Sequence, residues 1–155
     1  MKPAIVIAIR SFQGLLALGT LGMAAVVADW YINQSPFASP MTVNFLLFVP
    51  IFSVISIVYL EAVPRLAPRA SHPFVSLAFE LLNTIFYFAG FVAMAAFIAR
   101  LDFCRGVICA AAKAATVAGA GSFALWAGTS TLMIKDVFKG GMRRTGGGGP
   151  AMTER

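Results

Sequence analysis

The segment Pro73–Ala99, PFVSLAFELLNTIFYFAGFVAMAAFIA, decides the fold class, because it carries a single charged residue, Glu80, in an otherwise apolar run. A helix that crosses the hydrocarbon core of a bilayer needs about 20 mainly apolar residues, and this segment exceeds that length. Three further segments meet the same criterion, at 4–28, 42–63 and 114–134. The sequence therefore predicts an all-α membrane protein, a bundle of four spanning helices.

The composition of the whole chain agrees with a membrane environment. Of its 155 residues, 59% are apolar and 12% are charged, whereas an ordinary soluble domain is about 45–50% apolar and about 25% charged. So little charge cannot cover a surface that faces water, which argues against a soluble enzyme and against a disordered chain. The four segments take up most of the sequence and leave no room for a separate soluble domain.

The basic residues predict the orientation of the chain, because lysine and arginine favour the cytoplasmic side of a membrane. With four spans, both termini and the second connection lie on one side. That side holds eight basic residues and the other side three, with Arg10 left out because it lies inside the first span. We therefore expect both termini in the cytoplasm. The eight are Lys2, Arg65, Arg69, Lys135, Lys139, Arg143, Arg144 and Arg155, and the three are Arg100, Arg105 and Lys113.

Residues 1–138 form the predicted membrane domain, and residues 139–155 form a basic, glycine-rich tail. The tail contains a run of glycines, Gly146–Gly149, and cannot bury apolar area, so we expect it to be disordered. The first span also has features of a cleaved signal peptide, since Lys2 precedes an apolar run. Arg10 interrupts that run, which favours a retained helix.

Arg10 and Glu80 lie inside the first and third predicted spans, where a charge without a partner costs several kcal/mol. Arg10 follows the start of its span by six residues and Glu80 by seven. At 1.5 Å per residue, both lie roughly 10 Å inside the membrane from the cytoplasmic side. Gln13 and Asn83 each follow three residues later, one turn deeper on the same helix face. These matching depths predict two contacts, Arg10 with Glu80 and Gln13 with Asn83.

The Arg10–Glu80 pair has two interpretations. It can be a structural clamp that sets the register of the helices, or part of a path for protons or a substrate. A path requires further polar groups along the bundle, and the sequence offers few beyond Gln13 and Asn83, which favours the clamp. Glu61, near the end of the second span, could also compete for Arg10, because that helix returns to the same side.

Small residues recur at four-residue spacing in the fourth predicted span, at Ala120, Ala124 and Gly128. Such a row lets two helix backbones approach closely, which is how helices pack in lipid. Alanine and glycine are abundant in this segment, so the pattern is not specific for one partner. We expect the row to pack inside the bundle, with an oligomer contact as the alternative.

The chain has two cysteines, Cys104 and Cys109, both in the predicted outer connection. On an oxidising side of the membrane they would form a disulfide around Arg105 and Gly106; the alternative is two free or lipid-modified thiols at the membrane edge. No cluster of histidine and carboxylate residues accompanies them, so we expect no metal site. The single histidine, His72, is predicted to be an interfacial side chain. The sequence contains no nucleophile with a base and no phosphate-binding glycine loop, so we expect no enzymatic activity and no cofactor.

Two further features lie near the predicted membrane surfaces. Asn33 begins a glycosylation acceptor pattern, but Pro36 follows directly after the pattern and the membrane is close, so we expect an unmodified asparagine. Four basic residues lie within ten residues of the last span. Such clusters attract anionic lipids of the inner leaflet by about 1 kcal/mol per residue, although cytoplasmic orientation alone explains the same residues. They are Lys135, Lys139, Arg143 and Arg144.

The order and spacing of several motifs resemble the MARVEL-domain family over residues 4–138. Ile9-Arg10-Ser11-Phe12-Gln13 is similar to the Arg-x-x-Gln start of that family's first helix, and Phe79–Gly90 is similar to its acidic third-helix signature. Val43–Phe48 resembles the opening of the second span in fungal members. The segments that resemble the outer connection and the fourth helix are Cys104–Cys109, Lys113–Ala115 and Phe123–Trp126.

The resemblance implies a four-helix membrane protein that organises lateral membrane domains or vesicle traffic and has no enzymatic role. It extends to the fungal branch that includes the non-classical export and eisosome-associated tetraspan proteins. It therefore also implies a place in sterol- or sphingolipid-rich patches of the plasma membrane.

We expect a structural role, in which the bundle packs with copies of itself or with other membrane proteins and biases the local lipid composition. The lipid partners would be sterol, sphingolipid and anionic lipids of the inner leaflet. One alternative is an accessory subunit of a larger membrane complex, which needs only a packing face. Another is a small transporter, which should show broken helices and polar groups that converge near the midplane. No feature of the chain points to a nucleic acid partner.

Overall fold

The computed structural model describes residues 3–36, 38–66, 73–100 and 106–145, and this part of the chain folds into four helices. Each helix is long and apolar enough to cross a membrane. The predicted all-α fold with four spanning helices is therefore confirmed. The helices are α1 (Pro3–Asn33), α2 (Met41–Leu66), α3 (Pro73–Ala99) and α4 (Val107–Thr145).

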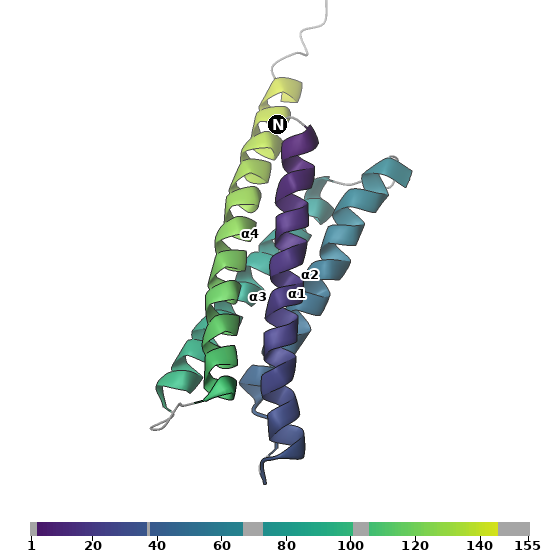
Figure 1. Ribbon diagram of the computed structural model, residues 1–155. Helices are drawn as coiled ribbons and strands as arrows, with labels where there is room; N and C mark the ends of the chain where they lie inside the picture. The colour runs from purple at the N-terminus through teal and green to yellow at the C-terminus, as the bar shows by residue number, and fades with distance from the viewer. Residues whose placement is uncertain (1–2, 37, 67–72, 101–105, 146–155) are drawn as a thin grey trace, which may run out of the picture.

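The helices form an up-and-down bundle in which each one packs against two neighbours (Figure 1). α1 packs against α2 and α4, and α3 packs against the same two helices. Within the described residues, α1 and α3 lie across the diagonal of the bundle without close approach of their backbones. The start of α1 and the last turns of α4 lie at the same end of the bundle (Figure 1). This geometry agrees with the expectation that both termini share one side of the membrane.

A proline or a glycine lies at the start of each of α2, α3 and α4. Pro73 occupies the first position of α3, where the missing N–H would have had no helical partner. The carbonyl of Pro40, just before α2, accepts hydrogen bonds from the amides of Val43 and Asn44 at 2.9 and 3.2 Å. Gly106, just before α4, has a φ of 87°, a conformation that residues with a Cβ rarely adopt. These residues thus favour the positions at which α2, α3 and α4 begin.

Each of three helices extends beyond the predicted span. α4 begins at Val107 instead of 114 and runs to Thr145, so residues 139–145, predicted as part of a disordered tail, are helical. The predicted limits followed the change from apolar to charged residues, which marks the edge of a membrane and not the end of a helix. Lysine and arginine are good helix formers, so a helix can continue into water. The other corrections are that α1 ends at Asn33 instead of 28 and α2 at Leu66 instead of 63.

The interior of the bundle changes from apolar to polar along its length. Tyr87 and Trp126 pack with Val49. Arg10 and Glu80 each follow the first residue of their helix by seven residues, and so lie nearer the end that holds the start of α1. Towards the opposite end the core consists of small and medium apolar side chains. These are Ala24, Val27, Ala28, Val43, Leu46, Met94, Ala112 and Ala115.

Candidate functional site

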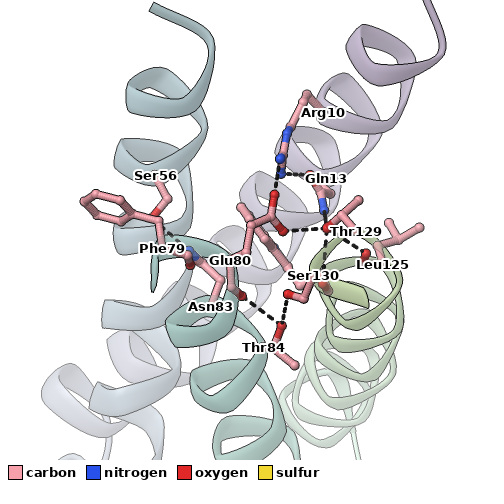
Figure 2. Close-up of polar contacts among 11 residues, drawn as sticks. Arg10, Gln13, Ser56, Phe79, Glu80, Asn83, Thr84, Leu125, Thr129 and Ser130 are labelled. Carbon is pink, nitrogen blue, oxygen red and sulfur yellow. Dashed lines mark hydrogen bonds and ion pairs between the residues drawn. The ribbon is translucent and has the colours of Figure 1, made fainter. Parts of the chain in front are cut away.

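Arg10 on α1 and Glu80 on α3 form an ion pair in the interior of the bundle (Figure 2). Arg10 is 8% exposed and Glu80 is fully buried. Arg10 Nη2 donates a hydrogen bond to Glu80 Oε1, so the contact predicted from the matching depths is present. Because α1 and α3 lie across the diagonal, the pair joins two helices whose backbones do not meet.

The ion pair belongs to a closed ring of hydrogen bonds that also contains Gln13 and Thr129 (Figure 2). Arg10 Nη1 donates to Gln13 Oε1 at 2.9 Å, and Gln13 Nε2 donates to Thr129 Oγ1 at 3.4 Å. Thr129 Oγ1 in turn donates to Glu80 Oε2 at 2.6 Å. Both carboxylate oxygens therefore accept a hydrogen bond, which a buried charge requires. We call these four residues the polar ring; they come from α1, α3 and α4.

Side chains of α3 and α4 surround the polar ring. The guanidinium carbon of Arg10 lies 5.2 Å from the centre of the Trp126 ring, within the range of a cation–π interaction. Thr84 on α3 and Ser130 on α4 lie beside Glu80, with their hydroxyl oxygens 3.1 Å apart (Figure 2). The guanidinium of Arg10 thus contacts both a carboxylate and an aromatic face.

The predicted contact between Gln13 and Asn83 is wrong. Asn83 Nδ2 donates to Ser56 Oγ on α2 at 2.8 Å, whereas Gln13 reaches Thr129 on α4. Three residues along a helix correspond to a rotation of roughly 60° away from the starting direction, so Asn83 is turned from Glu80 towards α2. At this depth the polar side chains therefore bind to adjacent helices and not across the diagonal.

Glu61 does not compete for Arg10. Its Oε2 accepts a hydrogen bond from Arg65 Nη2 at 2.5 Å, one turn further along α2. The Arg65 side chain is 62% exposed, so this is a surface pair of the kind that contributes about 1 kcal/mol or less.

Sequence reasoning missed the hydroxyl residues of the interior. Ser53, Ser56 and Ser130 are buried, and Thr129 is half-buried. Hydroxyl residues give a weak signal in a membrane helix, because each can bond to a carbonyl of its own helix, as Ser56 does one turn earlier. Ser53 and Ser56 are three residues apart and so lie on one helix face. This spacing is the sequence feature that could have indicated a polar inner face of α2. The expectation of few polar groups along the bundle is corrected accordingly.

The geometry of the polar ring is suited to holding helices together. Its two charges neutralise each other, and three of its four hydrogen bonds join different helices. Within the described ranges, no group of three or more His, Cys, Asp or Glu side chains is placed to hold a metal ion.

Comparison with known proteins shows to which family the chain belongs. Residues 3–132 match the MARVEL family, a membrane-associating domain, and this range covers α1 to α3 and most of α4, with every residue of the polar ring. The chain belongs to the MARVEL family. No curated protein and no solved structure matches it. The family resemblance is thus confirmed, and this MARVEL protein is an integral membrane protein with four spanning helices.

In this MARVEL protein the predicted row of small residues on α4 faces outward. Ala124 and Gly128 are exposed and Ala120 is half-buried, and a Cβ added at Gly128 would meet no atom within 4 Å. The expectation that this row packs inside the bundle is therefore wrong. Gly119 lies on the inner face instead, where a Cβ would come within 3.3 Å of Phe91 Cβ on α3.

Cys109 lies near the start of α4 of the MARVEL protein and is buried and disulfide-bonded. Cys104, the only other cysteine in the sequence, lies outside the described residues, as does His72. The pairing of the two cysteines stays a prediction. Asn33 ends α1, and its Nδ2 donates to Asp29 Oδ1 at 2.7 Å.

The basic residues that follow the last predicted span of the MARVEL protein belong to α4. Lys135 is exposed. Lys139, Arg143 and Arg144 lie on the same helix, with side chains outside the described residues. The helix thus carries this positive charge beyond the apolar part of the bundle.

Proposed function

We propose that this MARVEL protein is a non-enzymatic organiser of lateral membrane domains or vesicle traffic. It would act by packing with copies of itself and by contacting lipids, in keeping with the membrane-associating domain of its family. The plasma membrane is the proposed location, and the proposed lipids are sterol, sphingolipid and anionic lipids of the inner leaflet. The link to eisosome-associated and export proteins of fungi rests on the motif resemblance alone.

One observation carries the proposal: the outward face of α4 has a row of small residues that the bundle itself does not use. Ala124 and Gly128 are exposed, and space is open above Gly128. In lipid, helices associate where small residues let backbones approach, because apolar side chains gain nothing by leaving apolar lipid. The row is therefore suited to contact with a helix of a second copy.

The basic end of α4 supports lipid contact. Lys135 is exposed, and Lys139, Arg143 and Arg144 follow on the same helix. At the surface of a leaflet that contains anionic lipids, each such residue contributes about 1 kcal/mol of attraction. The cluster would hold anionic lipids around the cytoplasmic end of an assembly.

The first experiment is the mass of the particle extracted in native lipid nanodiscs, with its lipids identified. A particle of several 16.4 kDa chains, enriched in sterol or sphingolipid, is the result expected for a membrane organiser. A single copy attached at constant ratio to a larger protein would assign the chain as an accessory subunit. A monomer surrounded by bulk lipid would overturn the proposal.

A pair of substitutions tests the role of the outward row. Gly128→Leu places a branched side chain on the row and should reduce the particle to smaller oligomers. Ala89→Leu, on an exposed position of α3, adds a similar side chain elsewhere on the lipid-facing surface and should leave the mass unchanged. An equal loss of mass in both variants would show that the row has no special part in association.

A further inference from the structure

Three buried hydroxyl groups in the centre of the bundle have no hydrogen-bond partner. They belong to Ser53 on α2, Tyr87 on α3 and Ser122 on α4, and all three residues are fully buried. They lie one turn deeper than the Asn83–Ser56 hydrogen bond, since Ser53 precedes Ser56 by three residues and Tyr87 follows Asn83 by four. This hydroxyl triad is therefore a feature separate from the polar ring.

Tyr87 is the central member of the hydroxyl triad. The Tyr87 hydroxyl interacts with those of both Ser53 and Ser122, but none of the three oxygens has the distance and angles of a well-formed hydrogen bond. Each of α2, α3 and α4 contributes one oxygen, and the Tyr87 hydroxyl lies next to the other two. Neighbouring hydroxyls without a well-formed direct hydrogen bond are the arrangement in which a bridging water is expected.

A water molecule matches the needs of the hydroxyl triad. A buried hydroxyl that leaves water without a new partner loses its solvation and gains nothing in return. A buried water typically makes about three hydrogen bonds to polar groups that otherwise lack partners. We propose that Ser53, Tyr87 and Ser122 bind an ordered water molecule in the centre of the bundle.

Two more unpartnered atoms extend this polar region towards the polar ring. Both are buried: Trp126 Nε1 donates no hydrogen bond, and Asn83 Oδ1 accepts none. Trp126 packs with Tyr87 on one side, and its ring lies against the Arg10 guanidinium on the other. The proposed water therefore lies at the inner end of a polar region that begins at the ion pair, which is a property beyond membrane organisation.

Solid-state NMR on the full chain in lipid nanodiscs tests the water directly. The chain has three tyrosines, so labelling with ¹³C-tyrosine gives few signals, and Tyr87→Phe assigns the one of interest. In spectra that begin from water magnetisation, the Tyr87 ring should receive signal, and so should that of Tyr31, which is half-buried near the end of α1. Ser53→Ala combined with Ser122→Ala should remove the transfer to Tyr87 and leave Tyr31 unchanged. A Tyr87 ring that receives no signal from water, or one that keeps it in the double variant, overturns the proposal.

The unfolding equilibrium provides an independent test. Ser53→Ala, Ser122→Ala and Tyr87→Phe each remove one hydrogen bond of the water and should raise the unfolding equilibrium constant by about two- to tenfold. The combined Ser53→Ala and Ser122→Ala effect should be smaller than the product of the single effects, because the water is lost once. Thr20→Val is the control, since the Thr20 hydroxyl bonds to its own helix at Leu16 O. If the hydroxyls bind no water, their removal relieves a desolvation cost, so unchanged or increased stability in all three variants contradicts the proposal.

Discussion

Two opposite charges buried together in a bilayer stabilise each other only while both are present. Glu80 accepts hydrogen bonds from Arg10 and Thr129 through its two oxygens, and Arg10 also donates to Gln13. Removal of one charge leaves the other buried and unpaired, which costs more than the intact pair contributes. Substitution of a residue of the polar ring should therefore lower the stability far more than substitution of a charged residue at the surface of the same protein.

Replacing Glu80 with alanine should lower the free energy of unfolding by about 3–5 kcal/mol, because Arg10 is left without its carboxylate. The measurement is a titration of the purified protein from mild detergent into SDS, followed by circular dichroism. Glu61→Ala is the matched control. It breaks a pair at the surface of α2 and should cost about 1 kcal/mol or less.

A second variant separates charge pairing from packing at Glu80. Arg10→Met combined with Glu80→Ala removes both charges and should recover most of the stability that Glu80→Ala loses. Equal losses in the single and double variants would mean that the Glu80 side chain matters for its volume and not for its charge.

Thr129→Val should lower the free energy of unfolding by about 1.5–3 kcal/mol, since it removes a hydrogen bond to the buried carboxylate at nearly constant volume. Thr131→Val, two residues further along α4, is the control. Thr131 is exposed, and its hydroxyl bonds to Ala127 O of its own helix. The same SDS titration measures both, and similar values for the two variants would argue against a structural role for the polar ring at Thr129.

At the scale of the helices, α4 has two faces with small residues and uses them differently. Gly119 lies against Phe91 of α3, where an added Cβ would approach within 3.3 Å of the Phe91 Cβ. Gly128 lies on the outward face, where an added Cβ would meet nothing within 4 Å. Close packing of α3 on α4 therefore depends on the inner glycine and not on the outer one.

Gly119→Leu should destabilise the folded monomer by about 1–3 kcal/mol, because the larger side chain forces α3 and α4 apart. Gly128→Leu should leave the stability of the monomer in detergent unchanged within about 0.5 kcal/mol. Thermal unfolding of both variants, followed by circular dichroism, measures the difference. A larger loss at Gly128 than at Gly119 would contradict the assignment of inner and outer faces.

At the scale of the whole molecule, the bundle has one basic end and one end with few basic residues. The start of α1 and the last turns of α4 lie together (Figure 1), and Arg65 and Lys135 lie in the end regions of α2 and α4 that point the same way. The excess of lysine and arginine at this end predicts that it faces the cytoplasm.

Cysteine labelling in intact cells tests this orientation. In a background without Cys104 and Cys109, Gln34→Cys, just after α1, should react with a membrane-impermeant maleimide. Leu66→Cys, at the end of α2 and 84% exposed, should react only after the cells are permeabilised. The reverse pattern of labelling would place the termini outside the cell.

The sequence by itself determined the number of spanning helices and the depth of the ion pair. The thickness of a bilayer and the cost of a buried charge act on each residue according to its position along a helix. Those positions are readable from the chain, so the contact between Arg10 and Glu80 was predicted from depth alone. The helix ends were less accurate, because a helix can continue into water beyond the last apolar residue.

Only the tertiary structure decided which way each helix is turned about its axis. In water, polar residues mark the outer face of a helix; in lipid, the outer face and the core are both apolar, so that signal is absent. For this reason the sequence missed Thr129 as a member of the polar ring and paired Asn83 with the wrong residue. The outward row at Ala124 and Gly128 and the inward hydroxyls of Ser53, Tyr87 and Ser122 depend on the same rotations, which are set by the packing of neighbouring helices.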